Sequence, residues 1–291
     1  LIEAPDWLLQ ANFYDQQLAK YHDYYYSVGH AAGLTLNRQA RESTRVFHKR
    51  GWFGPDAVVG IMHFDTPAHK RVVDKEFLPE LKAAGVEKVV VQASKNFLEA
   101  DYNGTILKFQ TEGVTHVMFL GQNGGYPLMF MNAAEAQAYR PKYGLRTDNF
   151  PASIAPAVPA EQLRQVTGMG WQPTLDVAPQ HDPPRSASGE LCMKIMKEAG
   201  QDMNQRGAEG TALAYFDGLF FLRKALGGAS EVSVAGMSSQ VAALGRGYVS
   251  PLVFGTRFSA RRHDGVDAIR HIDFRADCSC LAYSSGEKRL S

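Results

Sequence analysis

The sequence predicts an α/β protein built around a parallel sheet that is buried on both faces. Short, continuous apolar runs begin at residues 57, 88, 115 and 142, and helical patterns occupy the intervals between them. Alternating strands and helices of this length form βαβ units, in which the strands are parallel and the crossovers right-handed. Continuous apolar strands are typical of a sheet covered by helices on both sides.

The first half of the chain supplies most of this pattern. The predicted strands are Ala57–Met62, Lys88–Gln92, Thr115–Leu120 and Lys142–Arg146. The predicted helices are Gln16–Lys49, Lys70–Ala84, Leu98–Glu112 and Pro127–Tyr139. Gly85 and Gly113 follow the second and third of these helices, where glycine supplies a left-handed cap before the next strand.

The second half has a different character. Three prolines among small residues predict a crossing segment outside the core at Phe150–Pro159, and Pro173–Pro184 contains four more prolines. Three helices are expected after it, at Ser188–Ala199, Thr211–Leu226 and Val232–Leu244. A β region follows, with Leu252–Ser259 and Ala268–Arg275 on either side of a turn at Arg261–Gly265. The helix Thr211–Leu226 is apolar over almost its whole surface, so we expect another element to cover it.

Composition excludes several function classes. The 291 residues include 31 basic and 30 acidic side chains, a net charge of +1 that offers no broad field for nucleic acid or anionic lipid. An apolar content of 45% excludes disorder for the bulk of the chain, and no run approaches the roughly 20 apolar residues of a membrane span. The chain begins at Leu1 with no charged and apolar leader, so we expect that a leader has been removed or that upstream chain is missing.

No catalytic or cofactor motif emerges, and we predict neither an enzyme nor a bound cofactor. The loop Gly121–Gly125 lies between a strand and a helix but lacks both phosphate-binding glycine patterns. The histidines are scattered singly, without a zinc-binding motif, and there is no serine nucleophile elbow.

The three cysteines leave their pairing open. Cys278 and Cys280 form a Cys-x-Cys pair in an expected strand, so both sulfurs would lie on one face, where a metal site lacks a third ligand in the sequence pattern. Export would favour a disulfide from Cys192 to one of the two; a free buried thiol is the alternative.

Polar loops after the predicted strands are the best candidates for a binding site, because ligands of open α/β sheets bind beyond the carboxyl ends of the strands. The candidate ligand-binding residues are Phe64, Asp65, Thr66, Gln122, Asn123, Thr147 and Asp148. Asp65 or Thr66 also suits the cap of a helix that begins near Pro67, and Asp148 suits a turn before Pro151.

The chain resembles the type I periplasmic binding proteins, in particular the branched-chain amino-acid receptors of ABC transporters and above all their actinobacterial versions. The resemblance is carried in order by Trp52 with Val58–Asp65, Phe77–Leu81, Tyr139–Leu145, Ser250–Phe258 and Cys278–Tyr283. It implies two α/β lobes joined by crossing strands, with a small solute bound between them, and it places the candidate loops in the second lobe.

By the same resemblance, residues 1–172 form the second lobe, 173–250 a mainly helical remnant of the first lobe, and 251–291 the crossing hairpin and return strands. Most of the first lobe is then lacking, and the helix Thr211–Leu226 loses the sheet that would cover it. Exposing its large side chains would cost several kcal/mol at about 25 cal/mol per Å². We therefore expect an incomplete chain or one that covers this face by association.

The resemblance implies a non-enzymatic receptor for an amino acid or related metabolite, outside the cytoplasm, periplasmic or lipid-anchored, that serves an ABC-transporter permease. The alternatives are a ligand-sensing module of the same fold without transport and a flavodoxin-like, nucleotide-using enzyme, which only the glycine loop favours.

Overall fold

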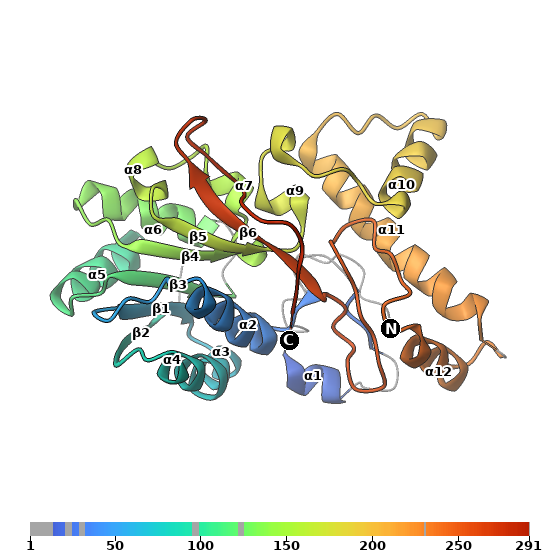
Figure 1. Ribbon diagram of the computed structural model, residues 1–291, viewed down its shortest axis with the longest axis horizontal. Coiled ribbons are helices and arrows are strands. Elements are labelled where there is room, and N and C mark those ends of the chain that lie inside the picture. The colour runs from blue at the N-terminus through green and yellow to red at the C-terminus, as the bar shows by residue number, and fades with distance from the viewer. Residues whose placement is uncertain are drawn as a thin grey trace.

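The computed structural model describes residues 14–20, 25–28, 33–94, 99–121, 125–229 and 231–290, and within them forms an eight-stranded sheet with helices on both faces (Figure 1). The strands are β1 (Val58–Phe64), β2 (Lys88–Ser94), β3 (His116–Leu120), β4 (Lys142–Arg146), β5 (Val166–Gly170), β6 (Ala268–Arg275), β7 (Cys280–Tyr283) and β8 (Lys288–Arg289).

The helices are α1 (Asp15–Lys20), α2 (Leu36–Lys49), α3 (Pro67–Val72), the π-helical η3 (Val73–Phe77), α4 (Leu78–Ala83), α5 (Glu99–Thr111), α6 (Gly125–Ala136), the 3-10 helix η4 (Thr147–Asn149), α7 (Pro151–Ile154), α8 (Ala160–Leu163), α9 (Pro173–Asp176), the 3-10 helix η5 (Pro179–His181), α10 (Ala187–Glu198), α11 (Arg206–Gly227) and α12 (Val234–Leu244).

The strand order is β2-β1-β3-β4-β5-β6-β7, with β8 paired to β6. Strands β1 to β5 are parallel, whereas β6 runs antiparallel to β5 and to β7. The chain passes from β1 outward to β2 and then returns to the other side of β1 with β3, so the strand order reverses between β1 and β3.

Side chains alternate between the two faces of the sheet, as the apolar runs predicted. In β3, Met118 and Leu120 join the core beneath α2, α3 and α4, while Val117 and Phe119 join the core beneath α5 and α6. Both faces are therefore apolar, which explains why this strand is a continuous hydrophobic run.

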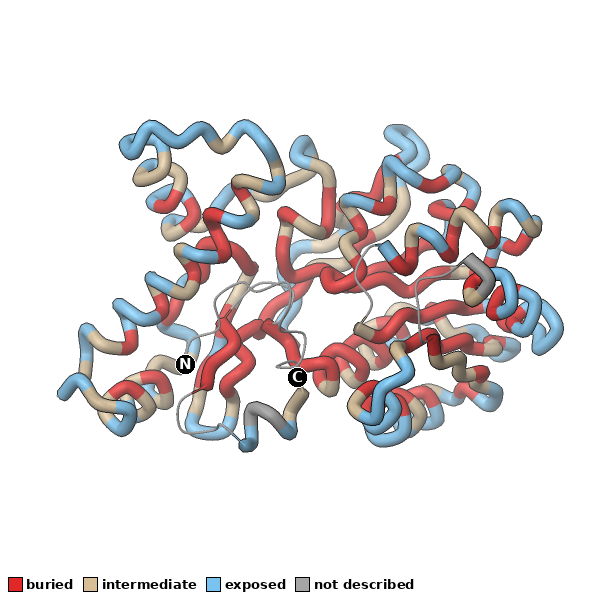
Figure 2. Tube along the Cα trace, turned by 180° about the vertical axis from the view of Figure 1, so that it is seen from behind, coloured by how far each residue is buried: buried red, intermediate tan, exposed pale blue. Residues whose placement is uncertain are grey.

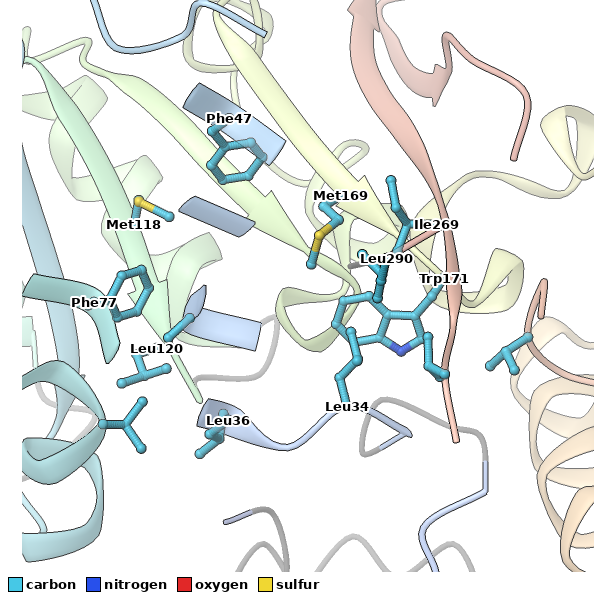
Figure 3. Packing of buried hydrophobic residues seen from close by; sticks show 14 of the residues in the cluster. Leu34, Leu36, Phe47, Phe77, Met118, Leu120, Met169, Trp171, Ile269 and Leu290 are labelled. Atoms are coloured by element: carbon cyan, nitrogen blue, oxygen red, sulfur yellow. The ribbon is translucent and has the colours of Figure 1, made fainter. Parts of the chain in front are cut away.

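The core beneath α2 requires a glycine in the sheet. A Cβ at Gly144 of β4 would lie 2.7 Å from the Phe47 ring and 3.0 Å from Trp52, so the absence of a side chain lets α2 approach the sheet. Figure 3 shows this core continuing from Phe47 to Trp171, which lies next to Leu34 and Leu290. Segments near both ends of the described chain thus close the same core.

Helices α10, α11 and α12 form an arm that stands beside the sheet (Figure 1). Seen from behind, buried residues follow the strands, while the arm is largely exposed or half-buried (Figure 2). On α11, Tyr215, Leu219 and Leu222 expose 52%, 59% and 36% of their surface. The apolar helix that the sequence predicted is therefore present, with one face uncovered.

Strands β6 and β7 extend the sheet of β1–β5. The domain boundaries at 172 and 250 stay a prediction.

Three sequence-based predictions of local structure were wrong. The helix expected over Gln16–Lys49 is two helices: α1 ends at Lys20, and α2 begins after Thr35, whose side chain accepts a hydrogen bond from the Arg38 N–H. The segment Leu252–Ser259 forms only isolated bridges such as Thr256 with Val266. The segment Phe150–Pro159, expected outside the core, contains α7 and packs Ile154 and Val158 into the core beneath α5 and α6. In addition, the sequence analysis did not predict the fifth parallel strand, β5.

The cysteine predictions are also corrected. Cys278 lies in the turn between β6 and β7, not in a strand, and it forms a disulfide with Cys280. Ser279 between them has a left-handed backbone (φ 47°), which turns the chain tightly enough to bring the two sulfurs together. Cys192 is the free thiol, fully buried in α10.

Candidate ligand-binding site

The carboxyl ends of β1 and β3 lie side by side at the point where the strand order reverses. His63 of β1 is in register with Leu120 of β3, so the residues that follow, Phe64 and Gly121, are neighbours at the edge of the sheet. In open α/β sheets, this reversal creates the crevice in which ligands bind. The structure therefore brings Phe64 and Gly121 together at the position that the topology favours.

Phe64 is the half-exposed member of an aromatic cluster at this edge. Its ring meets His69 edge-on, with centroids 5.4 Å apart, and Tyr126 likewise at 6.0 Å. The rings of His63 and His69 are stacked with centroids 6.5 Å apart. Edge-to-face packing of this kind holds each ring in one orientation. The cluster is thus a preformed aromatic surface, of which Phe64 is accessible.

Thr66 begins helix α3, as one of the two capping alternatives predicted. Its hydroxyl accepts a hydrogen bond from the His69 N–H at 3.2 Å and lies 2.8 Å from His69 Nδ1. The Tyr14 hydroxyl lies 3.0 Å from the same nitrogen. The two hydroxyls therefore fix the orientation of the imidazole, and both Asp65 and Thr66 remain exposed at the start of the helix.

Burial favours the neutral form of both histidines of the cluster. Burial lowers the pKa of His69 to about 4, with a smaller contribution from the neighbouring His63. Burial also lowers the pKa of His63, whose Nδ1 donates to the Phe64 carbonyl at 2.7 Å. The half-exposed Phe64 ring therefore lies against buried imidazoles whose neutral form is favoured.

Gly121 lets the loop after β3 approach this imidazole. Its backbone is left-handed (φ +63°), and a Cβ there would lie 2.5 Å from His69 Nε2. Within the described part of the chain, His69 Nε2 is buried without a hydrogen-bond partner. The glycine that follows β3 thus permits close packing against the His69 ring. Gln122 and Asn123 lie outside the described residues, and their role stays a prediction.

Thr147 and Asp148 lie at the end of β4 and have internal partners. Thr147 is fully buried; its hydroxyl donates to Asp176 at 2.7 Å and accepts from the Trp171 N–H at 2.8 Å. Asp148 accepts two hydrogen bonds of 2.9 Å from the buried Arg146. These contacts make the end of β4 a rigid support; direct contact of either side chain with a ligand stays a prediction.

Asp176, which the sequence analysis did not select, connects three elements behind the site. Its carboxylate accepts from Thr147, from the Tyr283 hydroxyl at 2.8 Å and from the Gln172 N–H at 2.9 Å. Burial raises its pKa to about 7, although all three hydrogen bonds oppose the shift. The carboxylate joins α9 to η4, directly after β4, and to β7, and so fixes how the chain leaves the sheet.

The other residues that were not selected are His63, His69 and Tyr126. His63 is the residue of β1 that directly precedes the selected Phe64, His69 follows Thr66 by three residues, and Tyr126 lies in the first turn of α6. Extending the search by one residue into the strand and by one turn into each following helix would have found them, because these positions border the same edge of the sheet.

No protein-family model matches the chain, and no curated protein sequence matches it either. Solved structures do match. A branched-chain amino-acid ABC transporter protein from Thermus thermophilus, solved with bound valine, has a TM-score of 0.68 at 11% identity over 98% of this chain and 84% of its own. An ABC transporter substrate-binding protein from Aeropyrum pernix has a TM-score of 0.70 at 12% identity, covering 97% and 70%.

A fatty acid ABC transporter substrate-binding protein from Thermomonospora curvata gives 0.66 at 10% identity, covering 99% of this chain and 74% of its own. The chain therefore has the type I periplasmic-binding-protein fold, as its sequence predicted. Within that fold, its neighbours include substrate-binding proteins of ABC transporters, with branched-chain amino-acid proteins among them. At 10–12% sequence identity, the similarity to these solved structures establishes the fold alone.

Proposed function

We propose that the chain is a solute-binding receptor that holds a small molecule at the carboxyl edge of β1 and β3. The observation that carries the proposal is the accessible Phe64 ring, held by His69 and Tyr126 at the reversal of the strand order. Binding sites for small molecules combine an aromatic or apolar wall with a few fixed polar groups. Asp65 and Thr66 supply polar groups beside this ring.

The uncharged state of the two imidazoles limits the ligand chemistry. A neutral aromatic wall favours an apolar or aromatic part of the ligand, since an anionic group would find no imidazolium there. We propose an amino acid or related metabolite whose side chain packs on Phe64, with Gln122 and Asn123 as further candidate contacts. Thr147 and Asp148 hold the end of β4 in place.

The proposed mechanism is closure without chemistry. A ligand that contacts both this edge and an opposing wall binds the closed state more tightly, and so shifts the population toward it. An ABC-transporter permease that recognises the closed state would take up the solute, at an extracytoplasmic location. Within the described residues, no helix is long and apolar enough to cross a membrane.

Isothermal calorimetry against amino acids, aromatic acids and small amides tests the proposal. Removing the Phe64 ring takes away roughly 1–3 kcal/mol of apolar contact, so Phe64→Ala should weaken binding of the best ligand by about 10- to 100-fold. Phe53→Ala is the matched control, because Phe53 is also half-buried but precedes β1 at the opposite edge. Equal losses in the two variants, or no binding across the panel, would count against the proposed site.

A further inference from the structure

Three metal-ligating side chains meet where the segment after α9 contacts the β6–β7 hairpin. Cys280 Sγ lies 3.1 Å from Nε2 of His181, although the two residues are 99 positions apart. The ligand atoms of His181, Cys278 and Cys280 all lie within 4.8 Å of one another. The sequence offered a Cys-x-Cys pair without a third ligand, and the fold supplies the imidazole.

Local structure holds these three side chains in place. His181 ends η5, a 3-10 turn that begins with a proline and closes with the His181 N–H donating to the Ala178 carbonyl at 2.8 Å. In the hairpin, Cys280 pairs with Arg275 across β6 and β7, and Ser279 has a left-handed backbone. A non-glycine residue in this conformation is uncommon and is often found at functional sites.

The cluster can exist in two redox states. In the structure, Cys278 and Cys280 form a disulfide. A dithiol reductant would supply two electrons to break the Sγ–Sγ bond, itself becoming a disulfide, and each sulfur would gain a proton. A bound cation would then displace both protons to solvent, because the thiolate is the ligand. Cys278 is exposed, which gives a reductant and a cation access to the pair.

We propose that, in the reduced protein, His181, Cys278 and Cys280 bind a thiophilic d10 cation, zinc(II) or copper(I). Two thiolates and one imidazole are soft and borderline donors of the kind that both ions prefer. At bond lengths of about 2.3 Å to sulfur and 2.0 Å to nitrogen, tetrahedral ligands lie roughly 3.5–3.8 Å apart. The three ligand atoms here lie within 4.8 Å of one another. Among the described residues, no fourth His, Cys, Asp or Glu joins the group, so water would complete a zinc shell, whereas copper(I) accepts three ligands.

The site would link two parts of the fold. η5 belongs to the proline-rich segment that leaves the sheet, and the hairpin belongs to the sheet edge; Tyr283 and Asp176 already join the same two parts by a hydrogen bond. The bound cation would add a second link between them, and oxidation of the pair would release it.

Competition titrations on the full chain test the proposal. The protein is reduced with dithiothreitol, desalted without oxygen and titrated with zinc(II) against a chromophoric chelator, and separately with copper(I) against bicinchoninate. We expect one equivalent of at least one ion to bind the reduced protein, with affinity about 100-fold or more above that of the oxidised protein. His181→Ala should weaken it by about tenfold or more, and Cys278→Ser with Cys280→Ser should abolish it.

Two matched variants serve as controls, Cys192→Ala for the buried thiol and His48→Ala for an exposed imidazole in α2. Both should bind like the wild type, and the oxidised wild type controls for folding because it has the same sequence. X-ray absorption should show two sulfur ligands and one imidazole nitrogen. The proposal is overturned if the reduced protein binds neither ion more tightly than the oxidised protein, or if His181→Ala leaves both affinities unchanged.

Discussion

Asp176 provides the sharpest test of how the site is supported. Replacing it by alanine removes the acceptor for Thr147, Tyr283 and the Gln172 N–H. A buried donor left without a partner costs about 1–3 kcal/mol, so Asp176→Ala should lower the free energy of unfolding by roughly 3–5 kcal/mol at pH 5. Asp176→Asn keeps an acceptor for Tyr283 and Gln172 and can donate to Thr147, so it should cost less than about 1 kcal/mol there.

The same variants separate hydrogen bonding from charge. The folded-state pKa of Asp176 is about 7 and its ordinary value is 3.8, so its contribution to stability is fully present below the unfolded pKa and is lost as the pH rises through about 7. Between pH 5 and pH 8, the wild type should therefore lose about 2–3 kcal/mol relative to Asp176→Asn, at 1.36 kcal/mol per pKa unit. Asp217, whose pKa burial also raises to about 7, titrates in both proteins and cancels from the difference.

Urea unfolding at pH 5 and pH 8 measures both effects, with tryptophan fluorescence as the signal because Trp171 lies beside this network. The reasoning is refuted if the wild type and Asp176→Asn change in parallel with pH. It is refuted equally if the alanine and asparagine variants have the same stability at pH 5.

Three further predictions concern the neighbouring surfaces and thiols. Gly121→Ala should lower the free energy of unfolding by about 1–2 kcal/mol, because Gly121 has a left-handed backbone. Gly104→Ala, in a helix with open space around it, should not destabilise the protein. Thermal unfolding measures both variants, and equal shifts in their melting temperatures would contradict this role of Gly121. Leu219→Glu, on the exposed face of α11, should leave the fold intact and reduce self-association, as measured by sedimentation. Leu213→Glu, at a residue that is 3% exposed, should unfold the chain. Unchanged self-association of a folded Leu219→Glu variant would show that the exposed face of α11 does not mediate it. Burial raises the pKa of Cys192 to about 11, so its thiol should resist a thiol reagent in the native protein. After unfolding without reductant, Cys192 should be the one cysteine that is labelled, because Cys278 and Cys280 form a disulfide. Labelling of the native protein, or of a different cysteine, would refute this pairing.

The four parallel strands that the sequence predicted are the ones whose residues face apolar cores on both sides, and the predicted strand Ala268–Arg275 is confirmed as β6. β5 (Val166–Gly170) was missed because two of its five residues are glycines. A Cβ at Gly168 would lie 2.9 Å from Ile272, and one at Gly170 2.4 Å from Asp176. Gly168 is required by a residue more than one hundred positions away, and Gly170 by a residue beyond the end of the strand. The local sequence does not indicate either contact.

The binding role of the candidate loops stays a prediction, whereas the contacts of their described residues can be compared with the sequence analysis. The rule that ligands bind beyond parallel strands selected the loops after β1, β3 and β4. Tertiary contacts determine which polar groups of these loops form hydrogen bonds within the protein. Thr147 depends on Asp176 for its partner, and Asp148 depends on the orientation of Arg146. The histidines were dismissed as scattered because six positions separate His63 from His69, and only the turn from strand to helix brings their rings together.

Hydrogen exchange with and without the best ligand from the calorimetric panel tests the binding edge directly. Amides of the loop after β1 and of the loop after β3 should be protected by the ligand, since both border the crevice beside Phe64. Protection confined to the groove between α10, α11 and α12, with the ends of β1 and β3 unchanged, would place the solute elsewhere and contradict the account.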